Sequence, residues 1–323
     1  MGSNNFMRIL VTGGSGFIGS HLVEELLEAG HSVASLDYRD PQTPLPAGVE
    51  DFRADFCEWD ALDRAFSSFQ PEAVCHLGAI PSVQKSILDP MPTMRSGVTG
   101  TYLVLEASRR HGARRVVFAS SGAVFGATGA EYAGRPLTED LPLKPLNPYG
   151  LSKKMGEEMM RLWASREIWN GSDTVSLRFF NVFGPRQRRD AAYATCIERF
   201  LYQWGAGDPF TIVPDGKQRR DMVFVKDIVR AVRLAAESGH RFNGEVINIG
   251  SGKNYSILQI ADIIGGSSHP RVFIEPRPGE VRETLADISK AKQLLGWEPQ
   301  ISFPEGTEIL KRDFSEVTPP KNE

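Results

Sequence analysis

The sequence has few cysteines, little net charge and no long apolar run, and each of these absences excludes a class of protein. Its three cysteines are widely spaced, cannot all pair with one another, and form no CxxC motif or Cys/His cluster; they are Cys57, Cys75 and Cys196. A disulfide scaffold and a structural zinc site are therefore not expected. The formal net charge is only -3, so neither nucleic acid nor an anionic membrane is expected as a partner.

No apolar run is long enough to span a bilayer, and the opening MGSNNF lacks the basic start and apolar stretch of a signal peptide. We therefore expect a cytoplasmic protein with reduced cysteines, no membrane contact and no metal site.

Short apolar runs alternate with helical patterns from residue 7 onward. RILVTG is followed by FIGSHLVEELLEAG, then by HSVASLD, VEDFRADF, PEAVCHLGA and ARRVVFASS. This βαβα series predicts an α/β fold of the Rossmann type, a doubly wound parallel sheet covered on both faces. We assign residues 7–180 to this domain, with 221–250 returning to it. Residues 181–220 and 251–323 are expected to form a smaller C-terminal α+β domain, over the sheet edge where such folds bind ligands.

The segment VTGGSGFIGSH places Gly13, Gly16 and Gly19 in a GxxGxxG spacing, directly after a strand and directly before a helix. Such glycines let the backbone turn tightly and approach a diphosphate, whose charge meets the free N–H groups of the helix N-terminus. The pattern favours a dinucleotide site. A glycine-rich turn without a ligand is the alternative.

The next predicted strand ends in ASLDYRD, about twenty residues past the glycines. Asp37 could accept hydrogen bonds from a ribose diol and would repel a 2'-phosphate, which favours NAD over NADP. The nearby Arg39 could accommodate that phosphate and leaves NADP open. Alternatively, Asp37 is only a turn residue.

The segment NPYGLSKKMGEEMM places Tyr149 and Lys153 on one face of a predicted helix that starts near Pro148. A free phenol has a pKa of about 10, so Tyr149 could act as a base near neutral pH only if that pKa fell by roughly three units. The Lys153 ammonium would supply the field. We expect KKMGEEMM to continue the polar face of this helix. Taken alone, the pair would more often be an ordinary helix start.

The glycine turn, SSGAVFG and YGLSK, in this order, resemble the extended short-chain dehydrogenase/reductase family, and within it the UDP-sugar 4-epimerases most closely. The resemblance implies that NAD is the cofactor and that a UDP-sugar is the substrate. It places catalysis on Ser121, Tyr149 and Lys153, although Ser120 and Ser121 could merely end a strand. It implies cofactor contacts at Gly13, Ser15, Gly16, Phe17, Ile18, Gly19, Asp37, Asp55, Phe56, Leu77, Ala79, Tyr149 and Lys153.

The two residues after this serine bear on the type of reaction. Related dehydratases and decarboxylases carry an acidic residue there, where this chain has Gly122 and Ala123. The simplest chemistry is then a 4-epimerase that acts through a transient 4-keto sugar. A 4-ketosugar reductase that exchanges its cofactor with solvent is a second hypothesis. A non-catalytic NAD-binding module is a third, although such a protein should have lost one of the catalytic side chains.

The resemblance also covers the predicted smaller domain, as far as about residue 300. By position it implies that Asn181, Arg220, Arg277 and Glu280 hold the nucleotide, since an arginine fork pairs well with phosphate oxygens. The residue that gates the sugar pocket in these epimerases is the small Thr284 here, which would admit an N-acetylamino sugar as well as glucose. The family's subunit pairing implies a homodimer through helices near 90–111 and 149–167.

Three further positions bear on the substrate and the cofactor. RQRRDAAY resembles a segment of uronic-acid epimerases and would place Arg188 on a sugar carboxylate, which makes UDP-glucuronate the alternative substrate. Gln84 stands where many of those enzymes have arginine, so we rank that substrate second. Gly97 replaces the asparagine of the family's Asn-Val-x-Gly-Thr segment, and the contact made by that side chain must be absent or replaced.

Overall fold

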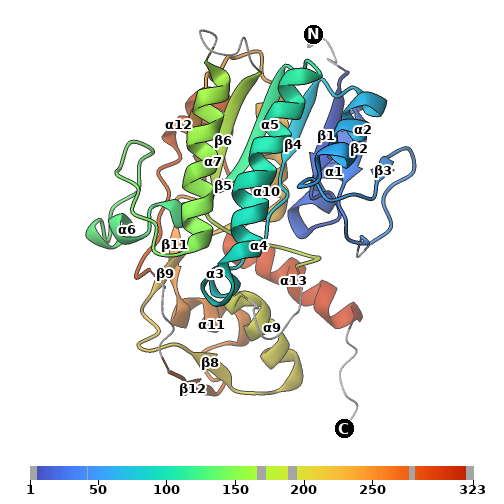
Figure 1. Cartoon of the computed structure of the whole chain (residues 1–323). Helices are drawn as coiled ribbons and strands as arrows, with labels where there is room; N and C mark the ends of the chain where they lie inside the picture. Colours follow the sequence, from blue (N-terminus) through green and yellow to red (C-terminus); the bar gives the residue numbers. More distant parts are fainter. Residues whose placement is uncertain (1–5, 42, 166–171, 188–194, 276–280, 318–323) are drawn as a thin grey trace.

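The computed structural model describes residues 6–41, 43–165, 172–187, 195–275 and 281–317, and Figure 1 shows its elements. The strands are β1 Arg8–Thr12, β2 Ser32–Leu36, β3 Glu50–Phe52, β4 Ala73–His76, β5 Arg115–Ser121, β6 Asp173–Phe179, β7 Asn181–Phe183, β8 Phe210–Ile212, β9 Arg219–Phe224, β10 Glu245–Ile249, β11 Asn254–Ser256 and β12 Arg271–Phe273. The helices are α1 Phe17–Glu28, α2 Trp59–Phe69, α3 Val83–Leu88, α4 Pro90–Met94, α5 Thr101–Arg110, α6 Ala127–Glu131, α7 Pro148–Ala164, α9 Cys196–Ala206, α10 Val225–Glu237, α11 Ile257–Gly265, α12 Ser289–Leu295 and α13 Phe303–Val317, with a π-helix η1 Arg95–Gly100 and a 3-10 helix η2 Gly122–Val124.

Seven parallel strands form the main sheet, in the order β10-β6-β5-β4-β1-β2-β3. Strand β1 lies inside the sheet, with Val11 level with Ser35 of β2 on one side and with Cys75 of β4 on the other. The chain therefore winds outward from β1 in both directions, which confirms the predicted α/β class. The crevice where the winding reverses, at the carboxyl ends of β1 and β4, is the usual ligand site of such sheets.

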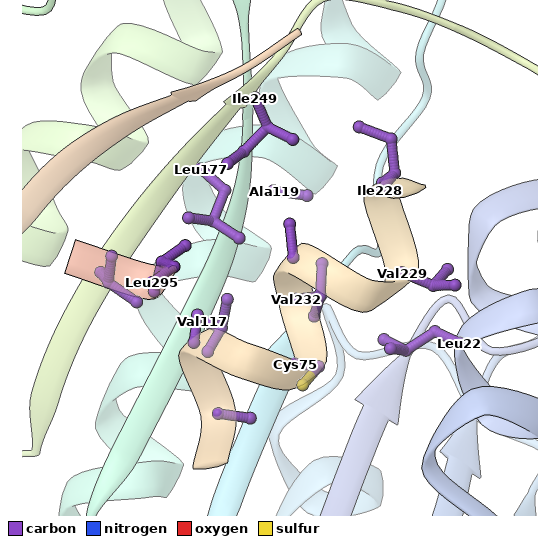
Figure 2. Close-up of a cluster of buried hydrophobic side chains, with 14 of the residues drawn as sticks. Leu22, Cys75, Val117, Ala119, Leu177, Ile228, Val229, Val232, Ile249 and Leu295 are labelled. Atoms are coloured by element: carbon purple, nitrogen blue, oxygen red, sulfur yellow. The ribbon is translucent and has the colours of Figure 1, made fainter. Parts of the chain in front are cut away.

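Both faces of the sheet are buried by helices. Apolar residues of α1, α10 and α12 pack on one face. Figure 2 shows Val232 of α10 and Leu295 of α12 on either side of Val117, with Leu22 of α1 on the far side of α10. Residues of α2, α5 and α7 cover the other face in a second cluster. Burial on both faces explains why β5 begins RVVFA, with little alternation between apolar and polar residues.

A smaller region continues beyond the carboxyl ends of the main strands, in the lower part of Figure 1. Strand β9 pairs with β7 in parallel and with β11 in antiparallel orientation, and β8 pairs with β12. Its core is aromatic, with the rings of Phe200 and Phe210 stacked 4.7 Å apart and Phe183 set edge-on to Phe303. Helices α9, α11 and α13 contribute to this cluster.

Among the helices in the described ranges, none combines the length and the apolar character that crossing a bilayer requires.

Candidate active site

The glycine turn joins β1 to α1 through tightly packed backbone. Gly13 follows β1 with φ +74°, a conformation that favours glycine. A Cβ on Gly19 would lie 2.0 Å from the carbonyl oxygen of Gly13, so α1 can pack this closely onto the turn only without a side chain there. The packing brings the N-terminus of α1 to the crevice beside the end of β4.

The turn has the features of a site for an anion. The N-cap residue Gly16 offers no side-chain hydrogen bond, and the first turn of α1 carries no acidic residue. The first N–H groups of a helix, here from Phe17 onward, have no partner within the helix. The buried Ser15 hydroxyl has no hydrogen-bond partner among the described residues. Uncapped N–H groups beside an unpaired hydroxyl fit the diphosphate of a dinucleotide.

The acidic residue expected at the ribose lies directly after β2. Asp37 is buried, and its two carboxylate oxygens accept hydrogen bonds from Nε and Nη2 of Arg39, both at 3.2 Å. The Arg39 guanidinium also approaches the glycine turn, because Nη2 lies 3.5 Å from where a Cβ on Gly16 would be. Asp37, which favours NAD, and Arg39, which could accommodate a 2'-phosphate, therefore form one ion pair beside the turn.

The other residues expected at the cofactor lie around the ends of β3 and β4. Leu77 follows β4 and donates its N–H to Thr12, and Ala79 comes two residues later. Phe56 packs against Gly78 and Gly100. Burial raises the pKa of Asp55, but hydrogen bonds from the Cys57 backbone and from Arg95 outweigh it, so this pKa lies below its usual value.

Ser121, Tyr149 and Lys153 lie together at the carboxyl end of β5. Asn147 caps α7 by accepting a hydrogen bond from the N–H of Gly150 at 2.9 Å, so Tyr149 falls in the first turn. The Ser121 hydroxyl lies close enough to the Tyr149 phenol for hydrogen bonding to lower the pKa of that phenol. The Lys153 ammonium donates to the carbonyl of Ala119 at 2.7 Å and lies 5.9 Å from the centre of the Tyr149 ring.

The ionisation of this group differs from the expectation. Burial raises the pKa of Tyr149, and the hydrogen bond with Ser121 opposes the rise without cancelling it. Burial lowers the pKa of Lys153 to about 8, opposed by the charge of Glu157. Desolvation thus dominates the pKa of Tyr149 in this structure, and the Lys153 ammonium is directed at the Ala119 carbonyl.

The prediction that KKMGEEMM continues the polar face of α7 was wrong for Glu157. Lys153 and Glu157 are both buried. They lie one turn apart on the face of α7 that packs on β5, and Glu157 pairs with Arg178 of β6. The local pattern does not reveal the burial of Glu157, because its partner strand is distant in the sequence.

Two of the residues expected at the nucleotide sugar meet directly. The Asn181 side-chain amide donates to the Thr284 hydroxyl at 3.2 Å and to the backbone carbonyl of Asp221 at 2.9 Å. The same Thr284 hydroxyl accepts the N–H of Asp221 at 3.1 Å. Arg220 precedes this aspartate on β9 and is half-buried, with its Nη1 donating to the carbonyl of Arg219. Arg188, Arg277 and Glu280 lie outside the described residues.

Asp221 joins three segments of the smaller region and was not predicted from the sequence. Its buried carboxylate accepts hydrogen bonds from the N–H groups of Ser251, Gly252 and Ala286 and from the Ser251 hydroxyl. Burial raises the pKa of Asp221 to about 6, against the lowering effect of these bonds. The signal was an acidic residue within the strand pattern RRDMVF, where a buried charge needs partners.

His76 was missed as well. Its ring lies between the hydroxyls of Thr12 and Thr101, at 2.6 and 3.1 Å, and stacks on Phe118. Burial lowers its pKa to about 3, helped by the charge of Lys153, so the ring is neutral at physiological pH.

Gly97 lies in the π-helix η1, where a Cβ would come 2.6 Å from the Ser152 hydroxyl. The glycine therefore lets η1 pack directly on α7, next to Lys153. Its carbonyl accepts a hydrogen bond from Thr101 at 2.8 Å. Gln84 lies on α3, whose Ser86 accepts the backbone N–H of Tyr149 at 3.3 Å.

Comparison with known proteins decides the family. The model of the NAD dependent epimerase/dehydratase family matches residues 9–250, which is more than half of this chain. The chain belongs to the NAD dependent epimerase/dehydratase family. The serine, tyrosine and lysine at the end of β5, at the same edge of the sheet as the glycine turn, are therefore the candidate active site of an NAD-dependent enzyme.

Relatives of this epimerase/dehydratase act on different sugars. The UDP-glucose 4-epimerase of Mycolicibacterium smegmatis is 35% identical over 311 residues, which cover 93% of this chain and 96% of the relative. The UDP-N-acetylglucosamine 4-epimerase of Methanobrevibacter ruminantium superposes with a TM-score of 0.87 at 30% identity, covering 97% and 99% of the two chains. The UDP-glucuronic acid 4-epimerase of Bacillus cereus, solved with UDP-glucuronic acid and NAD, has a TM-score of 0.85 at 33% identity, covering 97% and 100%.

Within the described ranges, no three His, Cys, Asp or Glu side chains are grouped as they would be around a metal ion.

Proposed function

We propose that this protein is an NAD-dependent UDP-sugar 4-epimerase that acts through a transient 4-keto sugar. The observation that carries the proposal is the grouping of Ser121, Tyr149 and Lys153 at the end of β5, at the same edge of the sheet as an uncapped glycine turn, in a chain of this family. UDP-glucose with UDP-galactose, or the two N-acetylamino analogues, are the substrates proposed first.

The chain's own residues have distinct tasks in this reaction. Tyr149 takes the proton from the sugar's 4-hydroxyl as C4 is oxidised, and returns a proton to that oxygen as C4 is reduced on the other face. The Ser121 hydroxyl holds the same oxygen by a hydrogen bond. The Lys153 ammonium stabilises the phenolate that forms, since an opposite charge nearby favours the ionised form. NAD, when bound, supplies the oxidant for C4 and then the reductant.

The residues around the glycine turn fit this cofactor. We assign the diphosphate to the N-terminus of α1 and to Ser15, whose hydroxyl is buried and unpaired within the described part of the chain. Asp37 would hold the ribose diol. Phe56, Leu77 and Ala79 surround the same crevice and are assigned to the remainder of the dinucleotide.

The nucleotide sugar is assigned to the smaller region. Arg220 would meet the diphosphate, and Asn181 with Thr284 would border the sugar. Arg277 and Glu280, outside the described residues, are proposed on the resemblance alone, as is Arg188 for a uronic acid. Consistent with this division, we propose that residues 7–180 and 221–250 form the cofactor domain, and that 181–220 and 251–323 form the substrate domain. Strand β9 pairs with β7 and β11 in the smaller sheet, so residues 221–224 lie at the boundary between the two proposed domains.

One experiment tests the proposal. The purified chain is incubated separately with UDP-glucose, UDP-N-acetylglucosamine and UDP-glucuronate, without added cofactor, and each mixture is analysed by NMR for the C4 epimer. Conversion of one of the first two is expected. Conversion of UDP-glucuronate alone would instead indicate a UDP-glucuronate 4-epimerase. The structural similarity to the Bacillus cereus enzyme supports this alternative. A requirement for added reduced cofactor would favour a reductase.

We also propose a homodimer through α5 and α7. Apolar side chains are exposed on these helices and on the adjoining α4; they are Met91, Tyr102, Leu151, Met155 and Leu162. Tyr102 sets its ring edge-on to Trp163, so the two helices already form one surface. Light scattering coupled to size exclusion should give the mass of two chains. A single-chain mass at micromolar concentration would contradict it.

The chain is further proposed to work in the cytoplasm. All three cysteines are free thiols, and two of them, Cys57 and Cys75, are buried. This pattern suits a reducing compartment.

A further inference from the structure

Helix α7 is fixed to the end of β5 by two polar contacts at successive residues. The Lys153 ammonium donates to the carbonyl of Ala119 at 2.7 Å. The Ser120 hydroxyl donates to a carboxylate oxygen of Glu157 at 2.6 Å. The next residue of the strand is Ser121, so both contacts set the register between the serine and the tyrosine of the candidate site.

Glu157 is paired as well as buried. Its side chain and that of Arg178 have no exposed surface, and the guanidinium donates from Nε to one carboxylate oxygen at 2.9 Å and from Nη2 to the other at 2.8 Å. Arg178 also donates to the carbonyl of Glu139 and lies over the ring of Phe125. Such a bidentate pair has a fixed geometry, and removing one partner leaves the other charge uncompensated in the core.

Within the described part of the chain, few titratable or charged groups face Lys153. On its own helix these are Tyr149 and Glu157, and behind the glutamate lies Arg178 of β6. His76 of β4 also faces it but is neutral at physiological pH, because burial lowers its pKa to about 3. Strand β5 presents the Ala119 carbonyl and the ring of Phe118, which lies 4.8 Å from the ammonium.

We propose that Glu157 and Arg178 are positioning residues, which neutralise each other behind Lys153 and leave its ammonium as the charged side chain, among the described residues, that acts on Tyr149. This inference rests on the proposed function, because it takes Tyr149 as the base. It differs from a purely structural role in that the two residues of the pair must have opposite effects on the tyrosine.

The test uses charge removal in both directions. Glu157→Gln leaves the Arg178 cation uncompensated, which lowers the pKa of Tyr149 and moves the acid limb of the kcat profile to lower pH by about one unit. Arg178→Gln leaves the Glu157 anion, which raises the pKa of Tyr149 and moves the limb to higher pH. The double variant is neutral again, and its limb returns to the wild-type pH.

Ser120→Ala is the matched control, because it removes the hydrogen bond to Glu157 and no charge. Its acid limb stays at the wild-type pH, whatever its turnover. A second readout is the ultraviolet titration of tyrosinate, with Tyr149→Phe as the blank, which follows the same ionisation without turnover. Circular dichroism checks that each variant is folded.

Opposite shifts in the single variants, cancelled in the double variant, support the inference. Shifts in the same direction, or none, overturn it. If Arg178→Gln does not fold, Glu157→Gln is compared with the double variant. An acid limb at the same pH in these two variants would overturn the inference. Turnover by Tyr149→Phe at the wild-type rate would instead refute the proposed function. Failure of the proposed function is thus distinguishable from failure of this inference.

Discussion

The cofactor side of the site is assembled from motifs that are each short and local, whereas the substrate side depends on contacts between residues far apart in the sequence. The glycine turn occupies residues 13–19, and Tyr149 and Lys153 share one turn of α7. In contrast, Asn181 and Thr284 are hydrogen-bonded across 103 residues of chain, and Asp221 holds both in place. The cofactor side therefore depends on local backbone geometry, and the substrate side on a few buried polar side chains.

The largest expected effect is on the cofactor side. Lys153→Met removes the buried ammonium, so turnover should fall by about 100-fold or more and the acid limb should move to higher pH, because the phenolate loses its nearby cation. Initial rates measured by NMR across pH give both values. Lys154→Met is the matched control, since this neighbouring lysine is directed at the carbonyl of Leu143. Equal losses in the two variants would contradict the role of Lys153.

A substitution on the substrate side should weaken UDP binding without weakening NAD binding. Asp221→Asn places an amide where a carboxylate accepts four hydrogen bonds, so at least one donor loses its partner. The free energy of unfolding should therefore fall by about 1 to 3 kcal/mol. Calorimetry should show UDP affinity reduced about tenfold, the same energy scale, with NAD affinity within about twofold. Asp60→Asn on α2, an exposed position, is the control. A loss of NAD affinity equal to that of UDP would refute the independence of the two sides.

The two sides should also respond to acid in opposite senses. The pKa of His76 falls from 6.5 to about 3 on folding. Its contribution to stability is therefore present above pH 6.5 and is lost, at about 1.4 kcal/mol per pH unit, as the pH falls toward 3. The pKa of Asp221 rises from 3.8 to about 6, so its contribution is present below pH 3.8 and is lost as the pH rises through 6.

Urea unfolding at pH 7 and pH 4.5 measures this difference. His76→Gln should lose less stability than the wild type between these values, and Asp221→Asn should lose more. If both variants changed in the same direction, one of the two assignments would be wrong.

The smallest effect is expected at the sugar. Thr284→Tyr should reduce the use of UDP-N-acetylglucosamine about tenfold more than that of UDP-glucose, because the larger side chain fills the space for the acetamido group. Thr284→Ser keeps the hydroxyl that accepts from Asn181 and should leave both substrates unchanged. Rates with each substrate give the ratio. An equal loss on both substrates with tyrosine would rule out Thr284 as the gate.

The features that could be predicted from the sequence are the local ones, and those that could not depend on contacts between distant residues. The strands, the glycine turn and the start of α7 at Pro148 are local signals, and the structure contains all of them. The inward direction of Glu157 was missed because its partner Arg178 lies on another element, 21 residues away. Asp221 was missed for the same reason, and the π-helix at Gly97 depends on the close approach of α7.

The central claim is that the phenol of Tyr149 moves the proton of the sugar's 4-hydroxyl. The most direct measurement compares the wild type with Tyr149→Phe, following C4 epimer formation by NMR and UDP affinity by calorimetry on the same preparations. We predict that the variant loses turnover by about 100-fold or more while its UDP affinity stays within about twofold. Turnover close to that of the wild type would contradict the claim.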